Sequence, residues 1–503
     1  MSLKRNFSVG LFSSIWSALI GLAVVPLYLK FLGTESYGLI GFFATMQAFL
    51  QLLDMGLSPT INREVARCSA SGNLQEAKEL LHTVAVVYWT IAGVIALIVL
   101  ALAPVIAEHW LQSKHLPTET IEKAVMLMGM VVACRWPVGL YMGALMGLQR
   151  VALSSIIGTI FATLTSLGAV AVLAFISPTI KAFFIWQACV GIIFAIIIRM
   201  VAWRILGSKN ESRRFSFANL KRIWRFSAGI SGVAITGAIL IQLDKVLLSK
   251  LLNLEDFGRY MLAATISNGL YIILTPLFNA VYPRMTALIA SGNIDKLTDL
   301  YKMGTRLFLA ALFPIAITAA VFSKDLLFLW TRNKELAESS SLIVSFFLIG
   351  TTLNGVMHFP FALQLAYGET RLPFKINLIL IAIMVPMTIT LAKTFGAVGG
   401  AGSWALLNFI YVFIGTWLTH RVLLKGIGSQ WLMGDVMLPF VIASIIGAFG
   451  LLIQGAKLPI YVDLIACVAL VFVTFAIIVV ISPRLRGMMQ NARANGLTGL
   501  SFF

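Results

Sequence analysis

The chain has 503 residues, of which 59% are hydrophobic and only 12% are charged, and its formal net charge is +18. A soluble globular protein carries about twice that charged fraction, so the composition excludes a soluble enzyme or a soluble binding domain. The 4 cysteines have no C-x-x-C spacing, which predicts neither a disulfide framework nor a zinc site.

Apolar stretches of roughly 20 residues recur along the whole sequence, each long enough to cross ~30 Å of hydrocarbon as a helix. We therefore predict an all-α polytopic membrane protein with about fourteen transmembrane helices. In chain order, these spans are expected at residues 9–29, 38–58, 80–104, 121–146, 151–176, 180–203, 227–250, 259–283, 305–322, 341–366, 374–393, 399–419, 435–454 and 460–481. Lys and Arg are concentrated in every second connection, and the positive-inside rule then predicts that both termini are cytoplasmic.

A short polar island between the first two predicted spans occurs twice in the chain. Residues 30–38 read "KFLGTESYG" and residues 250–258 read "KLLNLEDFG". The same offset aligns "ASGNL" at 70–74 with "ASGNI" at 290–294, where Asn73 and Asn293 are expected to cap the helices that follow. The sequence therefore contains an internal repeat.

The repeat predicts the domain organisation. An even number of spans per copy gives both copies the same orientation, and parallel repeats with a substrate site between them are a recurring plan of secondary transporters. We expect two parallel six-helix repeats that form two lobes, followed by a C-terminal helix pair. The first lobe comprises residues 1–220 with a basic cytoplasmic linker, the second 221–420, and the helix pair with a cytoplasmic tail 421–503.

The basic linker raises the question of a nucleic-acid partner. Its densest part, residues 204–226, has aromatic residues interleaved with Lys and Arg, as an RNA-binding segment would. A cytoplasmic linker beside anionic lipid headgroups needs the same charges. We favour the linker, and predict no nucleic-acid partner.

Several stretches, in order along essentially the whole chain, resemble a known family. Besides the island at 30–38, they are "LLDMGLSPTINREVAR" (52–67), "GALMGLQR" (143–150), "QLDKVLLSKLLNLEDFGRY" (242–260) and "PFALQLAYGETR" (360–371). With them the chain resembles a Wzx-type flippase of the polysaccharide transporter family, within the multidrug/oligosaccharidyl-lipid/polysaccharide (MOP) exporter superfamily.

The resemblance implies export of an undecaprenyl-diphosphate-linked oligosaccharide across the bacterial inner membrane. It also implies alternating access of the two lobes, coupling to an H⁺ or Na⁺ gradient, no cofactor, and contact with membrane lipids and the polysaccharide polymerase or ligase machinery. Drug exporters share the fold of this superfamily, so the fold alone does not give the cargo.

Charged residues inside the predicted spans are the first candidates for a site, because charges at membrane depth are costly and usually functional. Arg135 lies in the fourth span, and Asp244 and Lys245 lie in the seventh. A lipid-linked diphosphate is anionic, so a cavity that presents Arg and Lys would lower the barrier to its passage. We predict that Arg135 and Lys245 line a central cavity and contact the anionic or sugar portion of the cargo.

A structural role for these charges is the alternative. Asp244 and Lys245 are neighbours on a helix and are not expected to face each other well. Asp244 would then pair with Arg135 across the lobes and neutralise it.

Further candidates are less distinctive. Asp54, near the end of the second span, and Asp244 are possible ion-coupling groups, although Asp54 also suits a helix end at the membrane interface. His358 in the tenth span either titrates during proton coupling or is satisfied by a neighbouring helix. Some neutral polar residues inside spans should line a sugar-binding cavity and others only join helices; they are Gln47, Gln51, Gln242, Asn268, Asn354, Gln364 and Asn408.

Other function classes fit the sequence less well. There is no G-x-x-x-x-G-K-[ST] loop for ATP and no metal-binding motif, so neither ATP hydrolysis nor a metal site is expected. An ion-coupled multidrug-type exporter and a flippase for another lipid-linked precursor remain as alternatives. A membrane glycan polymerase, ligase or acyltransferase is disfavoured, because the predicted outer loops are too short for a catalytic constellation.

Overall fold

The computed structural model describes residues 3–54, 56–207, 215–456, 459–487 and 490. The described residues are almost entirely helical, and the β-type pairing within them is limited to one isolated bridge between Gln112 and Asn253. Residues 208–214 of the predicted basic linker and 491–503 of the predicted tail lie outside this description. The chain divides into two compact units, Met1–Gly258 and Arg259–Phe503; the predicted repeat boundaries at 220 and 420 stay a prediction.

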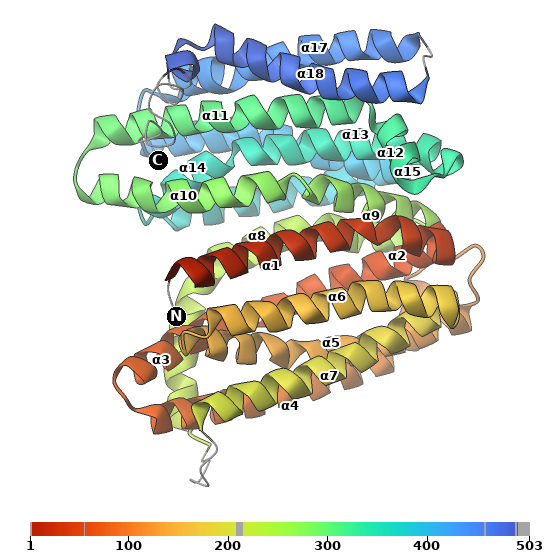
Figure 1. The fold of residues 1–503 in the computed structure, drawn as a ribbon, viewed down its shortest axis with the longest axis vertical. Helices are drawn as coiled ribbons and strands as arrows, with labels where there is room; N and C mark the ends of the chain where they lie inside the picture. Colours follow the sequence, from red (N-terminus) through yellow and green to blue (C-terminus); the bar gives the residue numbers. More distant parts are fainter. Residues whose placement is uncertain (1–2, 55, 208–214, 457–458, 488–489, 491–503) are drawn as a thin grey trace. The chain divides into compact units, whose positions relative to one another are not determined.

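Long helices that run alongside one another build the Met1–Gly258 unit (Figure 1). They are α1 (Leu3–Ala23), α2 (Val25–Gln51), the short 3-10 helix η1 (Leu52–Asp54), α3 (Leu57–Ala70), α4 (Leu74–His109), α5 (Thr118–Gly147), α6 (Val151–Phe175), α7 (Ile180–Leu206), α8 (Phe217–Leu251) and the start of α9 (Leu254–Asn268). Helix α5 is central, since it packs along both α4 and α7.

The Arg259–Phe503 unit contains the rest of α9 and the remaining helices. They are α10 (Tyr271–Ala290), α11 (Ile294–Val321), α12 (Ser323–Thr331), α13 (Lys334–Val356), α14 (His358–Ala366), α15 (Arg371–Val422), α16 (Gly428–Gln430), the π-helix η2 (Trp431–Met437), α17 (Leu438–Gly455) and α18 (Ile460–Ile481). Helices α17 and α18 pack against each other and against α11, and they correspond to the predicted C-terminal pair (Figure 1).

Helix α15 is a hairpin of two helices rather than one rod. Its 52 residues include Gly396, whose φ of 59° and ψ of −137° are not helical. Thr388 and Ser403 lie on either side of this point, and their hydroxyl oxygens are 3.0 Å apart. In a straight helix, residues this far apart in sequence would be separated by about 1.5 Å for every residue between them. The chain therefore folds back at Gly396, and α15 covers the spans predicted at 374–393 and 399–419.

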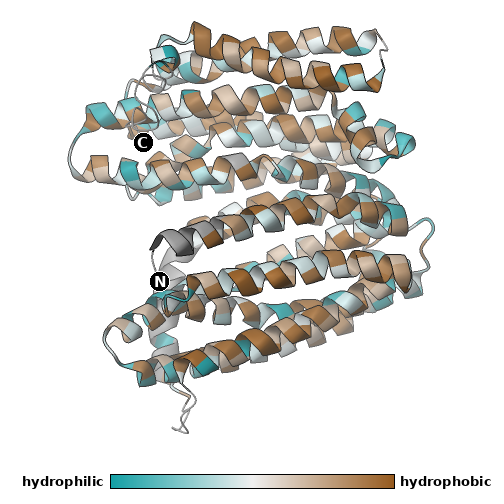
Figure 2. Ribbon diagram, in the orientation of Figure 1, coloured by the Kyte–Doolittle hydropathy of each residue, from teal (hydrophilic) through white to brown (hydrophobic). Residues whose placement is uncertain are grey.

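The helices have the length and hydropathy of membrane spans. Among the described residues, 10 helices qualify, or 11 if α1 and α2 count as one bent span. Hydrophobic residues dominate the long helices, whereas hydrophilic residues gather near their ends and in the connections (Figure 2). The predicted all-α multi-pass membrane fold is confirmed, whereas the count of fourteen spans is not.

The two copies of the repeated island lie against each other within the Met1–Gly258 unit. A Cβ atom on Gly38 would come within 2.2 Å of the Leu254 carbonyl oxygen, and one on Gly258 would come equally close, 2.2 Å, to the Thr34 carbonyl oxygen. The repeat offset relates Gly38 to Gly258 and Thr34 to Leu254, so this contact is symmetric. Glycine recurs here because the backbones approach too closely for any side chain.

The connection between α4 and α5 joins both copies of the island. The buried Glu35 carboxylate accepts hydrogen bonds from the Ser113 hydroxyl at 2.8 Å and from the Lys114 backbone N–H at 2.7 Å. From the same connection, the Gln112 carbonyl oxygen accepts a hydrogen bond from the Leu254 backbone N–H at 2.7 Å, and the Trp110 indole N–H donates to the hydroxyl of Ser249, just before the second copy, at 2.9 Å. Residues 30–38 and 249–258 therefore form a hydrogen-bonded end of this unit.

The predicted helix caps are confirmed. The Asn73 side chain accepts a hydrogen bond from the Glu76 backbone N–H at the start of α4, and Asn293 does the same for Lys296 at the start of α11, both at 3.2 Å. Each cap satisfies a backbone donor that the first helical turn leaves unpaired.

Candidate functional site

A polar cavity of about 280 Å³ lies inside the Met1–Gly258 unit. It is lined from four elements by Gln47, Gln51, Asp54, Ser58, Val132, Arg135, Trp136 and Gly139. The structure thus brings together two of the predicted site residues, Arg135 and Asp54, and two of the predicted polar residues, Gln47 and Gln51. Polar groups around an open space in an otherwise apolar helix bundle are the usual composition of a ligand site.

Arg135 is held by a neutral partner. Its guanidinium donates a hydrogen bond to the Gln187 side-chain oxygen on α7, and its Cζ atom lies 5.8 Å from the centre of the Phe43 ring. Within the described part of the chain, no acidic side chain forms an ion pair with Arg135. The predicted alternative of an Arg135–Asp244 pair is therefore wrong, and Arg135 retains an uncompensated positive charge at the cavity.

Asp54 is surrounded by neutral donors. Its carboxylate accepts hydrogen bonds from the Ser58 backbone N–H at 3.2 Å, from the Ser58 hydroxyl at 2.9 Å and from the Tyr88 hydroxyl. Gly56 makes these contacts possible, because its φ of 74° turns the chain between η1 and α3. Asp54 therefore lies at a helix end, which was one of the two predictions for it, and it also lines the cavity. Its role as an ion-coupling group stays a prediction.

Asp244 and Lys245 form an ion pair on α8. The Lys245 Nζ atom is 3.2 Å from Asp244 Oδ1 and also donates to the Ile241 carbonyl oxygen at 2.6 Å. Our expectation that these neighbours would not face each other is wrong, because the long lysine chain folds back by one helical turn and returns its ammonium to Asp244. Neither residue lines the cavity around Arg135, nor does the half-buried Gln242.

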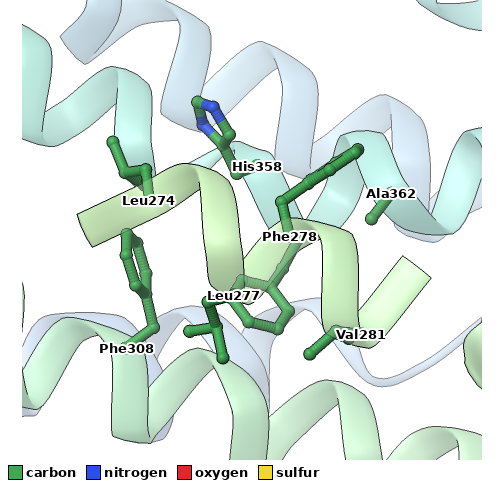
Figure 3. Close-up of a pocket in the computed structure, with 8 residues that line it drawn as sticks. Leu274, Leu277, Phe278, Val281, Phe308, His358 and Ala362 are labelled. Carbon is green, nitrogen blue, oxygen red and sulfur yellow. The ribbon is translucent and has the colours of Figure 1, made fainter. Parts of the chain in front are cut away.

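His358 lies in the other unit, beside a small apolar cavity. Figure 3 shows the imidazole close to leucine and phenylalanine side chains; this cavity is lined by Leu274, Leu277, Phe278, Val281, Phe308, His358, Phe359 and Ala362. The His358 Nδ1–H donates to the Asn354 carbonyl oxygen at 3.3 Å. These surroundings resemble the predicted alternative of a histidine satisfied by its neighbours, and its role in coupling stays a prediction.

The structure separates polar residues that face the cavity from those that join helices. Asn354 donates to the Asn408 side chain at 2.8 Å, and Gln364 donates to the Thr419 hydroxyl at 2.7 Å. Such interhelical hydrogen bonds are common in membrane bundles. These three polar residues of the predicted set therefore have structural partners, unlike Gln47 and Gln51.

Sequence reasoning missed four residues of the site, namely Ser58, Tyr88, Trp136 and Gln187. Gln187 had a usable signal, since it is a single polar residue in the apolar run "AFFIWQACVGIIFAII". Tyr88 and Trp136 had none, because aromatic residues are frequent in membrane helices. Among the residues that the structure describes, no group of three or more His, Cys, Asp or Glu side chains could hold a metal ion.

Comparison with known proteins places this architecture among transporters. Residues 3–289, more than half of the chain, match the family described as "Polysaccharide biosynthesis protein", and residues 233–390 match the MatE family. A candidate O-antigen transporter of Shigella flexneri is 21% identical over 427 residues, which cover 84% of this chain and 99% of that protein.

Solved structures show the same fold at low sequence identity. The lipid II flippase MurJ in an inward closed conformation gives a TM-score of 0.68 at 13% identity, over 93% of this chain and 97% of that one. An inward-facing multidrug resistance transporter of the MATE family gives 0.64 at 14% identity, over 84% and 96%. Proteins that carry this fold include both flippases and drug exporters.

Proposed function

The chain belongs to the polysaccharide biosynthesis protein family, as a Wzx-type transporter of the MOP exporter superfamily, and from this membership we propose that it flips a lipid-linked oligosaccharide. The proposed cargo is an undecaprenyl-diphosphate-linked repeat unit, moved from the cytoplasmic to the periplasmic leaflet of the bacterial inner membrane by alternating access. The candidate O-antigen transporter and MurJ support this class of cargo by analogy.

The cavity around Arg135 is the observation that carries the proposal. Sugar hydroxyls and a diphosphate lose their hydration in the membrane, so they need hydrogen-bond partners and a countercharge inside the protein. Gln47 and Gln51 supply amide donors and acceptors, and Arg135 supplies a cation that is not neutralised by an acidic partner. A drug exporter for apolar compounds would have little use for this combination.

Arg135 and Asp54 are the cargo and coupling residues that we favour. Lys245, Asp244, Gln242 and His358 remain proposals for the substrate pathway, because their positions in the structure neither add them to this cavity nor exclude a role in the transport cycle. We also propose that the protein operates beside a polysaccharide polymerase or ligase.

Asp54 is proposed as the proton- or Na⁺-coupling group. Its carboxylate lines the same cavity as Arg135, and neutral hydrogen bonds hold it in place without a fixed countercharge. In Asp54→Asn, the amide oxygen can still accept from the Ser58 and Tyr88 hydroxyls, the Ser58 backbone N–H loses its acceptor, and the charge that would bind a cation is removed. We expect a normal folded yield and transport that no longer responds to an imposed pH or Na⁺ gradient in proteoliposomes. An unchanged gradient response would rule Asp54 out.

A multidrug-type exporter is the second candidate function, and the match of residues 233–390 to the MatE family favours it. Deletion of the gene separates the two functions. We expect a single undecaprenyl-diphosphate-linked repeat unit to accumulate on the cytoplasmic face of the inner membrane. Sensitivity to cationic drugs with normal lipid-linked intermediates would favour the exporter, and accumulation of flipped but unpolymerised units would favour a role after flipping.

A further inference from the structure

Gln187 is the side chain that forms a hydrogen bond with Arg135, and it has no role in the function proposed above. It lies on α7, is 3% exposed, and its side-chain oxygen accepts a hydrogen bond from the Arg135 guanidinium. Its side-chain nitrogen donates to the Thr165 carbonyl oxygen on α6 at 3.3 Å. The amide therefore links three helices of the Met1–Gly258 unit at the wall of the cavity.

The Thr165 carbonyl fixes which way the amide points. A carbonyl oxygen only accepts hydrogen bonds, so the Gln187 NH₂ group must face Thr165 and the Gln187 oxygen must face Arg135. The guanidinium is thereby anchored in one orientation by a group without charge. Gln187 takes one of the several N–H donors of Arg135, which leaves others for a ligand in the cavity.

A glutamate at position 187 would fill the same volume with a different result. Its carboxylate would form an ion pair with Arg135, and the positive charge of Arg135 would then be compensated within the protein. Gln187 thus orients Arg135 and leaves its charge available to a ligand. Glutamate has nearly the same shape and differs only in its terminal group, but it would compensate that charge.

We propose that Gln187 is a positioning residue that orients Arg135 and leaves its positive charge uncompensated for an anionic group of the cargo. This inference rests on the proposed flippase function and deepens it, because it assigns an anion, either a phosphate or a sugar carboxylate, to the cavity that Arg135 lines. Both groups are planar or tetrahedral oxyanions that a guanidinium binds through two oxygens.

Transport by Gln187→Glu and Gln187→Leu tests the proposal, with rates normalised to folded protein in proteoliposomes. Gln187→Glu should lower transport at least 10-fold, as far as Arg135→Gln does, because it neutralises the cation. Gln187→Leu loses both hydrogen bonds of the amide and should reduce thermal stability more, yet transport should fall only severalfold because Arg135 stays charged. The reverse order of transport would show that Gln187 is only a structural link, and would overturn the proposal.

Gln364 provides the matched control for a carboxylate buried in a membrane helix. It is 1% exposed and donates to Thr419, and no basic side chain of the described residues forms a hydrogen bond or ion pair with it. Gln364→Glu and Gln364→Leu should affect transport to a similar extent. If Gln364→Glu instead impairs transport as selectively as Gln187→Glu does, buried charge in general explains both losses and the proposal fails.

A binding measurement identifies the anion. Thermal shifts of the wild-type protein and Gln187→Glu are measured with undecaprenyl diphosphate and, separately, with glucuronate. Stabilisation of the wild type alone by undecaprenyl diphosphate assigns the phosphate, and stabilisation by glucuronate assigns a sugar carboxylate. Equal shifts in both proteins, or none in either, would overturn the proposal. A wild type that transports lipid-linked oligosaccharide but whose rate is unaffected by Gln187→Glu refutes this inference alone, whereas a wild type that transports none refutes the proposed function.

Discussion

Arg135, which is half-buried, and Lys245, which is buried, are two cations of the Met1–Gly258 unit with different surroundings. Lys245 has a carboxylate partner, Asp244, whose side chain is fully buried, and both lie away from the polar cavity. Arg135 has an amide partner and lines the cavity. Removing one member of a buried ion pair destabilises the fold, because the other charge is then uncompensated. A charge without a partner lowers stability by itself, and an oppositely charged ligand can offset that cost.

Removing the Asp244 charge should therefore be costly. Asp244→Asn leaves the Lys245 ammonium buried without a countercharge, and breaking a buried pair in this way costs about 3–5 kcal/mol. We expect a lower free energy of unfolding and a lower Tm in detergent. The double variant Asp244→Asn, Lys245→Met removes both charges and should recover most of the loss. A single variant as stable as the wild type would contradict this role of the Asp244–Lys245 pair.

At the scale of elements, the repeated island is a packing device. The two copies of the island cross at Gly38 and Gly258 so closely that each glycine lies against a backbone carbonyl of the other copy. The α4–α5 connection then forms hydrogen bonds with both copies, through Glu35 and Leu254. The composition of the island reflects this close approach.

Gly38→Ala tests the crossing. The added methyl group would meet the Leu254 carbonyl oxygen at 2.2 Å, and a backbone carbonyl cannot move aside as the end of a flexible side chain can. Overpacking of this kind costs roughly 1–3 kcal/mol or more, so the Tm should fall clearly. Gly93→Ala in α4 is the control, since a Cβ there meets nothing within 4 Å. If both variants have the same Tm, the helices do not cross as described.

At the scale of the whole molecule, the distribution of Lys and Arg predicts the orientation of the chain in the membrane. Both termini are predicted to be cytoplasmic. A C-terminal green fluorescent protein fusion should therefore be fluorescent, and a C-terminal alkaline phosphatase fusion should be inactive. The opposite pair of results would place the C-terminus in the periplasm and require an odd number of spans if the N-terminus is cytoplasmic.

Sequence reasoning predicted the membrane class and the helix caps, because these depend on hydropathy and local hydrogen bonding. It also gave Arg135 as a cavity candidate and Asp54 as an ion-coupling candidate; both line the polar cavity, and their roles stay predictions. It did not predict that Gln187 anchors Arg135 or that Lys245 folds back to Asp244. Both contacts depend on side-chain rotamers and on which helices are neighbours, and the local sequence pattern does not predict these. The span count is also ambiguous in the structure, since α15 turns at Gly396 without leaving a loop between its halves.

Reconstituted transport tests the central claim most directly. Purified wild-type protein and Arg135→Gln are placed in vesicles that contain an undecaprenyl-diphosphate-linked oligosaccharide, and a membrane-impermeant glycosidase reports how much of the sugar reaches the outer leaflet. The wild type should expose the protected pool, faster under an imposed pH or Na⁺ gradient, and Arg135→Gln should slow this exposure at least 10-fold at equal folded protein. A wild-type protein that leaves the inner pool protected, while it exports small cationic compounds, would contradict the account.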